Sequence, residues 1–122
     1  MKNDKEFWNK HGNFIENNKR GYGYWIWKSY LIKKEMDKMM DGDILLYLDA
    51  GCEVDYKKKE LFKDYFYYVK QDYIIGSQLD HLEKTWTKMD LINYMDMKEY
   101  LNTGQREGGI NMFYVNNKTR QL

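Results

Sequence analysis

The sequence predicts an α/β fold in which helices flank a mostly parallel β-sheet. The first observation is that amphipathic helical segments alternate along the chain with short apolar segments, the order that is typical of such folds. The second is that the apolar segment Ile44-Leu45-Leu46-Tyr47-Leu48 shows no polar alternation, as in a strand that is covered on both faces. The third is that 122 residues suit one domain, which we expect to span residues 1–122.

The first part of the chain predicts a short helix followed by a loop. Asn3 or Asp4 is a suitable N-cap, and apolar residues at helical spacing follow it. We expect this helix to end near Gly12, because glycine commonly ends a helix. The polar residues 16–23 then predict a loop.

Helix and strand patterns continue through the middle of the chain. Residues 24–40 place apolar side chains at three-to-four spacing and lysines opposite them, which predicts an amphipathic helix. Gly42 is typical of the left-handed position after a helix. After the apolar strand, residues 57–71 predict a second amphipathic helix and residues 73–77 a second buried strand.

The last elements are a helix and a third strand. Thr87-Lys88-Met89-Asp90 resembles a capping box, with Asp in place of Glu, and it predicts a helix that runs to about Met95. Residues 110–115 predict a strand that Gly108-Gly109 introduces.

Composition and charge limit the classes of function. Hydrophobic residues make up 43% of the chain, enough for an ordered core. A formal net charge of +1 disfavours general electrostatic binding of nucleic acid. Cys52 is the single cysteine, so no intramolecular disulfide can form. No apolar run reaches the ~20 residues of a membrane span, and no secretory signal is visible, so we expect a soluble, cytoplasmic protein.

The residues after the most apolar strand are the candidate site. In open α/β sheets ligands bind beyond the carboxyl ends of the strands, and Asp49 occupies that position. A carboxylate there is costly to leave unpaired, and a divalent cation or a basic partner would offset the cost. Glu53 and Asp55 could add oxygen ligands, which suit Mg²⁺ or Mn²⁺. The alternative, that Asp49 only caps the turn that follows, stays open at this point.

Two motifs in the block from Arg20 to Asp55 carry a family resemblance. GYGYWIWK and LDAGCE together resemble nucleotide-sugar-dependent glycosyltransferases of the GT-A fold, especially the type found in capsular polysaccharide synthesis and in large viruses. Tyr47-Leu48-Asp49-Ala50-Gly51 is similar to the strand that ends in the family's D-x-D motif. WTKMDL and QREGGINMFYV are looser matches. The resemblance covers most of the chain from Arg20 onward, and it corresponds to the central part of such a domain.

The resemblance implies roles for individual residues. Asp49 matches the first acid of the D-x-D motif, and Lys28 matches a basic residue near the donor diphosphate. Gly51 replaces the second acid, so Asp49 and Glu53 are the expected metal ligands, with Mn²⁺ or Mg²⁺ as cofactor. The residues expected to bind the nucleotide-sugar are Lys28, Asp49, Ala50, Gly51 and Gly109.

The implied function is transfer of a sugar from a nucleoside-diphosphate sugar to an acceptor hydroxyl of a glycan or another molecule, with assistance from a divalent metal. No general base can be named, because Asp80, Glu83, Asp90 and Glu107 are equivalent at this level. A truncated or inactive copy is the alternative, namely a non-catalytic carbohydrate- or protein-binding module of the same lineage.

Aromatic residues beside the first basic cluster allow one further interpretation. Tyr22, Tyr24, Trp25 and Trp27 lie close to Arg20 in the sequence, and aromatic and cationic side chains together can bind single-stranded nucleic acid. The near-neutral net charge favours ordinary packing of these side chains, and we expect no nucleic-acid partner.

Overall fold

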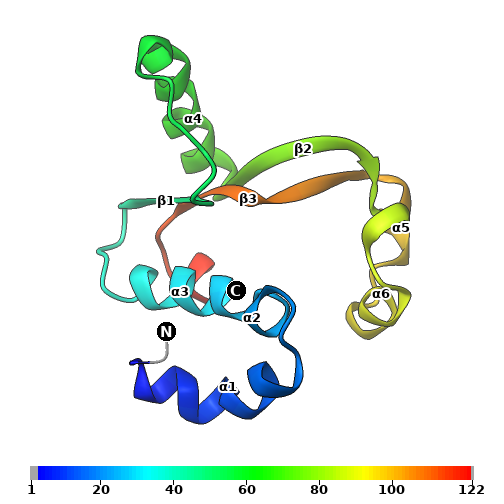
Figure 1. The fold of residues 1–122 in the computed structure, drawn as a ribbon. Coiled ribbons are helices and arrows are strands. Elements are labelled where there is room, and N and C mark those ends of the chain that lie inside the picture. The colour runs from blue at the N-terminus through cyan, green and yellow to red at the C-terminus, as the bar shows by residue number, and fades with distance from the viewer. Residues whose placement is uncertain (1–2, 122) are drawn as a thin grey trace. The chain divides into compact units, whose positions relative to one another are not determined.

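The structure, a computed structural model, describes residues 3–121 of the chain (Figure 1). These residues form two compact units. One contains residues 3–43 together with 115–121, and the other contains Ile44–Tyr114. None of the helices formed by residues 3–121 has the length and apolar character needed to cross a bilayer.

The first unit is helical. It consists of α1 (Lys5–Asn17), α2 (Gly21–Tyr24), α3 (Ile26–Met36) and the short 3₁₀ helix η3 (Thr119–Gln121). The predicted N-cap is confirmed for Asp4, whose carboxylate accepts a hydrogen bond of 3.2 Å from the backbone N–H of Phe7. Phe7 is fully buried, and its ring lies 4.8 Å from the ring of Tyr30 in α3. This contact joins α1 to α3.

Both predicted helix ends in this unit were wrong. The first helix continues through Gly12 to Asn17. A β-carbon at Gly12 would stand 3.0 Å from the Trp8 indole, so glycine here makes room for that ring within the helix. The second helix ends at Met36 and not at residue 40. Arg120 accounts for this end, because it donates hydrogen bonds to the carbonyl oxygens of Met36 and Met39, at 3.4 and 2.7 Å.

The segment α2, together with Trp25, is a left-handed turn between α1 and α3. The five consecutive residues Gly21 to Trp25 all have positive φ angles, between 50° and 80°. Such a run is uncommon for L-amino acids, because the β-carbon crowds the backbone. Trp27 supports the turn, since its indole N–H donates a hydrogen bond of 3.2 Å to the carbonyl oxygen of Gly21. The expected loop therefore ends in an ordered, strained segment.

The second unit contains the sheet. Its strands are β1 (Ile44–Leu48), β2 (Ile74–Leu82) and β3 (Gly104–Tyr114), in the order β1-β3-β2. All three predicted strands are present, but β3 pairs antiparallel with both neighbours. The expectation of a mostly parallel sheet was therefore wrong. The coarser expectation of an α/β fold is confirmed.

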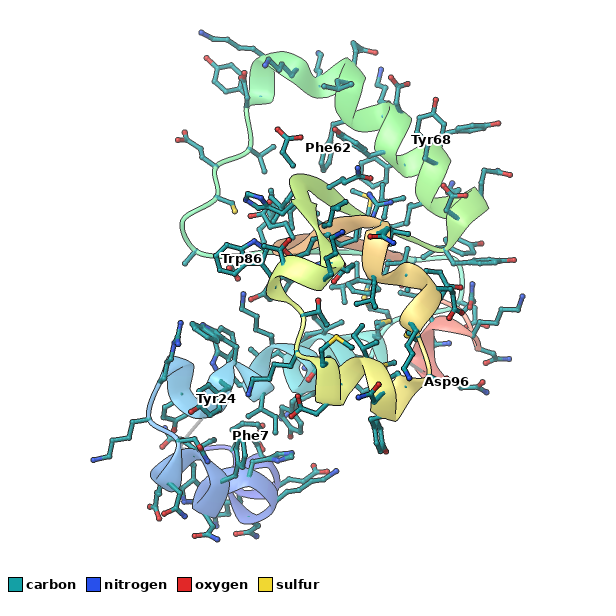
Figure 2. All side chains as sticks on the ribbon, turned by 90° about the vertical axis from the view of Figure 1, so that its right-hand side faces the viewer. Phe7, Tyr24, Phe62, Tyr68, Trp86 and Asp96 are labelled. Atoms are coloured by element: carbon teal, nitrogen blue, oxygen red, sulfur yellow. The ribbon has the colours of Figure 1, made fainter. Side chains whose placement is uncertain are left out.

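The connection between β2 and β3 explains the antiparallel pairing. Leu82 at the end of β2 pairs with Gly104 at the start of β3, so the two strands form one long arm that turns back on itself. Residues 83–103 carry α5 (Glu83–Trp86), α6 (Met89–Met95) and the 3₁₀ helix η2 (Lys98–Asn102). Figure 1 shows these helices at the far end of the arm, and Figure 2 labels Trp86 and Asp96 there. They do not form the crossover that a parallel pair needs.

The helix α6 lacks the predicted capping box. Its N-cap is Lys88, without a side-chain cap hydrogen bond, and the Thr87 hydroxyl instead donates to the carboxylate of Glu83 in α5. The helix predicted at residues 57–71 is confirmed as the 3₁₀ helix η1 (Tyr56–Lys58) followed by α4 (Lys59–Asp72). α4 projects from the sheet in Figure 1, and Val69 is its buried residue.

Candidate functional site

Asp49 lies immediately after the carboxyl end of β1. Its backbone N–H donates a hydrogen bond of 2.8 Å to the carbonyl oxygen of Gly109 in β3, and its own carbonyl accepts one of 2.8 Å from Cys52. The backbone of Asp49 thus extends the sheet and closes the turn that follows. Its carboxylate oxygen Oδ1 accepts a hydrogen bond of 2.7 Å from the Tyr47 hydroxyl. The half-buried carboxylate is therefore oriented by a neighbouring side chain.

Tyr47 is held in its neutral form by this arrangement. Burial raises the pKa of Tyr47 to about 12, and the hydrogen bond to the Asp49 carboxylate contributes to the increase. A neutral phenol can donate its proton to a carboxylate, whereas a phenolate cannot. Tyr47 therefore remains a donor to Asp49 at all physiological pH values.

The carboxylate of Glu107, like that of Asp49, lies close to Gly109 in β3. A β-carbon at Gly109 would stand 3.1 Å from Oδ2 of Asp49 and 3.1 Å from Oε1 of Glu107. Both carboxylates therefore lie next to the space that a side chain at position 109 would occupy. The β2–β3 pairing shifts its register in this part of β3, and the approach of the Glu107 carboxylate to the Cβ position of Gly109 places both on one side of the strand. We call Asp49, Glu107 and Gly109 the acidic cradle.

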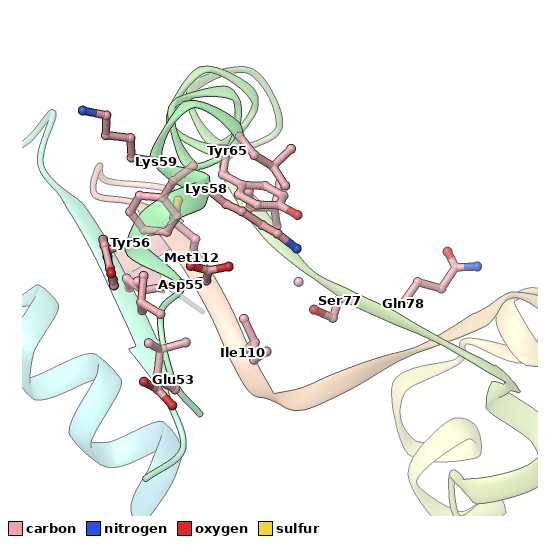
Figure 3. Close-up of a pocket in the computed structure, with 17 residues that line it drawn as sticks. Glu53, Asp55, Tyr56, Lys58, Lys59, Tyr65, Ser77, Gln78, Ile110 and Met112 are labelled. Carbon is pink, nitrogen blue, oxygen red and sulfur yellow. The ribbon is translucent and has the colours of Figure 1, made fainter. Parts of the chain in front are cut away.

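The sheet separates the acidic cradle from a large cavity. Alternate residues of a strand point to opposite faces, and Leu46 and Leu48 line a cavity of about 660 Å³ on the other face (Figure 3). Asp49 and Tyr47 lie on the face that carries the cradle. Glu53 lines the cavity instead, so the two expected metal ligands have different surroundings. A role for Glu53 toward a metal stays a prediction.

The other predicted residues differ in position. Ala50 and Gly51 are exposed in the turn after Asp49. A β-carbon at Gly51 would meet no atom within 4 Å, so the turn after Asp49 is open to close approach. Lys28 lies in the first turn of α3, in the other unit. Its contact with a diphosphate stays a prediction.

The side chains of the cradle fit a hard divalent cation in part. Among residues 3–121 no group of three or more His, Cys, Asp and Glu side chains is placed to hold a metal ion. Mg²⁺, however, is commonly bound by one or two carboxylates together with substrate phosphates, and it keeps several waters. Two carboxylates beside the buried Gly109 match the protein part of that pattern. Asp49 and Glu107 are the residues that would hold such a cation.

Two of these residues were not singled out from the sequence. Glu107 is one of several equivalent acids in the sequence, and Tyr47 belongs to the apolar strand and the D-x-D-like segment without a role of its own. A signal for both exists in the spacing, because each stands two residues before a predicted site residue, Gly109 or Asp49. In a strand this spacing places both side chains on one face.

Comparisons with known proteins add no assignment to this geometry. No protein-family model, no curated protein and no solved structure matches the chain.

Proposed function

We propose that the chain binds a nucleoside-diphosphate sugar at the acidic cradle and transfers its sugar to an acceptor hydroxyl. The proposal depends on one observation: Oδ2 of Asp49 and Oε1 of Glu107 each lie 3.1 Å from the position that a β-carbon of residue 109 would occupy. The resemblance of LDAGCE to a D-x-D motif supports the same assignment from the sequence. The open backbone at Gly51 gives a ligand room to approach.

The reaction needs little covalent chemistry from the protein. The acceptor oxygen forms a bond to the anomeric carbon, and the bond from that carbon to the diphosphate oxygen breaks. The diphosphate leaves with the electron pair, and the hydroxyl proton passes to a base or to water. Negative charge therefore develops on the leaving group, and stabilising that charge lowers the barrier.

The residues of the acidic cradle and the neighbouring Tyr47 have distinct roles in this reaction. Asp49 and Glu107 would hold a divalent cation, which when bound supplies positive charge to the diphosphate. Tyr47 fixes the orientation of Asp49 through its hydrogen bond of 2.7 Å. Gly109 keeps the space beside the two carboxylates free of a side chain.

Release of nucleoside diphosphate tests the proposal. The chain is incubated with a panel of nucleoside-diphosphate sugars, Mn²⁺ and simple glycan acceptors, and the released diphosphate is measured. We expect Asp49→Asn and Glu107→Gln to lower the rate by about 100-fold or more, the size of loss seen when a charge-stabilising group is removed. Asp55→Asn is the control, since Asp55 follows the same strand but accepts from the Lys57 N–H at 3.0 Å as the cap of η1.

Three outcomes are distinguishable. Turnover that both cradle variants lose supports the proposal. Metal-dependent binding without turnover supports the non-catalytic module of the same lineage. Turnover that neither variant changes rules out the acidic cradle as the donor site.

A further inference from the structure

We propose that the cavity on the opposite face of the sheet binds a single-chain amphiphile, a linear alkyl chain that carries one anionic head. This site goes beyond the proposed sugar transfer and uses other residues. It lies within the second unit, between the sheet and α4 (Figure 3). Its volume of about 660 Å³ falls within the range of about 300–1,000 Å³ that is common for small-molecule sites.

The cavity has two apolar walls that do not close on each other. The sheet wall comes from all three strands and consists of Leu46, Leu48, Ile75, Ile110 and Met112. The helix wall consists of Leu61, Phe62 and Tyr65 from α4, and Figure 2 shows Phe62 between α4 and the strands. Water between two such walls is unfavourable, and an alkyl chain that displaces it is stabilised.

The exposure of α4 shows why the cavity stays open. Val69 near the end of the helix is fully buried, whereas Leu61 near its start is 51% exposed and Tyr65 is 45% exposed. The helix thus packs on the sheet through its C-terminal part, and the cavity lies under its N-terminal part. A narrow chain fits between walls that meet at one end.

The polar rim of the cavity favours an anionic head. Lys58, Tyr65 and Ser77 line the cavity, and in Figure 3 the Lys58 amino group and the two hydroxyls lie toward one end. An ammonium and two hydroxyls can all donate hydrogen bonds to a carboxylate.

The acidic residues of the rim are placed differently. Asp55 also lines the cavity, but its carboxylate accepts from the Lys57 N–H as the cap of η1. Glu53 lies toward the other end in Figure 3. The cationic end therefore remains available to the head of the ligand.

A chain-length series tests the apolar part of the proposal. Octanoate, decanoate and dodecanoate are titrated into the full chain by calorimetry, below the concentrations at which they aggregate. We expect the dissociation constant to fall about three- to fourfold per added methylene, the increment for burying a CH₂ group. Affinity that does not depend on chain length overturns the proposal.

Variants of the lysines at the rim of the cavity test whether the ligand carries an anionic head group. We expect Lys58→Ala to weaken decanoate binding about three- to tenfold, the range for a partly exposed charged hydrogen bond, and to leave decanol binding unchanged. Lys57→Ala is the matched control, because Lys57 neighbours Lys58 without lining the cavity. Equal losses in both lysine variants, or tighter binding of decyltrimethylammonium than of decanoate, contradict an anionic head.

A filled cavity provides the last test. Ile110→Phe adds volume at the sheet wall, and we expect it to abolish decanoate binding while circular dichroism and Tm show a folded protein. Asp49→Asn should leave decanoate binding unchanged, since Asp49 lies on the other face. If light scattering shows a dimer of the chain and decanoate does not bind, the proposal is wrong.

Discussion

Asp49 and Glu107 each place a carboxylate oxygen 3.1 Å from the point where Gly109 would carry a β-carbon. Asp49 follows β1, Glu107 lies in β3, and the two residues are 58 positions apart in the sequence. Two neighbouring carboxylates repel each other, and a cation bound beside both would reduce that repulsion. Substituting Gly109 therefore tests whether this part of β3 is a binding site or an ordinary strand.

Gly109→Ala should impair ligand binding more than it impairs folding. Its methyl group would contact both carboxylates at 3.1 Å and occupy the space between them. We expect Mn²⁺-dependent binding of a nucleoside diphosphate to weaken about tenfold or more, the scale of loss when the residues that orient metal ligands are changed. Gly108→Ala is the control, because its β-carbon would meet no atom within 4 Å. Equal affinity in the two variants, measured by calorimetry, would show that the cradle binds nothing.

The hydrogen bond from Tyr47 to Asp49 predicts a dependence on alkaline pH. The pKa of Tyr47 is raised to about 12 in the folded chain, whereas a tyrosine in an unfolded chain ionises near 10. The neutral phenol is thus favoured by folding. Its contribution is complete below about pH 10 and is lost as the pH rises toward 12.

Difference titration measures this effect. The phenolate absorbance of the wild-type chain minus that of Tyr47→Phe should show one group that titrates near pH 12. Between pH 10 and 12 the free energy of unfolding should fall more steeply in the wild type than in Tyr47→Phe. A difference spectrum that titrates near 10 would contradict the burial and the hydrogen bond of Tyr47.

The left-handed turn predicts a costly glycine substitution. Gly23 has a φ of +80°, and a β-carbon there would stand 2.7 Å from Cγ1 of Ile15. We expect Gly23→Ala to lower the free energy of unfolding by about 1–3 kcal/mol, from backbone strain and overpacking. Gly51→Ala, which meets no atom within 4 Å, should change stability little in the same urea titration. A neutral Gly23→Ala would mean that this turn is not formed.

Removing the hydroxyl group of Tyr22, in the same turn, should have the opposite effect on stability. Among the described residues its hydroxyl oxygen is buried without a hydrogen-bond partner, and an unsatisfied buried polar group is destabilising. Tyr22→Phe removes that group and keeps the ring, so we expect no loss of stability and a gain of up to about 1 kcal/mol. Tyr30→Phe is the comparison, since the Tyr30 hydroxyl donates to Asp4 at 3.2 Å. A lower Tm for Tyr22→Phe than for Tyr30→Phe would contradict this description of the turn.

Local pattern predicted the elements of this fold better than their direction. The continuous run Ile44–Leu48 is the first strand of the sheet, and the residue after it, Asp49, was predicted at its carboxyl end. The direction of β3 was not predictable, because an apolar strand looks the same whether its neighbour is parallel or antiparallel. Its length was underestimated, since Gly108-Gly109 looks like a break although β3 runs from Gly104 to Tyr114.

The same underestimate explains why Glu107 was missed. Placed before the strand, Glu107 has no defined direction, and it is equivalent to any other acid. Placed within β3, two residues from Gly109, it shares the face on which the Asp49 carboxylate lies. The pairing of β1 with β3 then brings together residues that no local spacing connects.

Calorimetry of nucleoside diphosphates with and without Mn²⁺ tests the central claim most directly. The proposal predicts that at least one nucleoside diphosphate binds the wild-type chain only when Mn²⁺ is present. It also predicts that Asp49→Asn and Glu107→Gln each weaken that binding about tenfold or more, while Asp55→Asn leaves it unchanged. Binding that is independent of Mn²⁺, or that survives both cradle substitutions, would contradict the claim that these two carboxylates form a donor site.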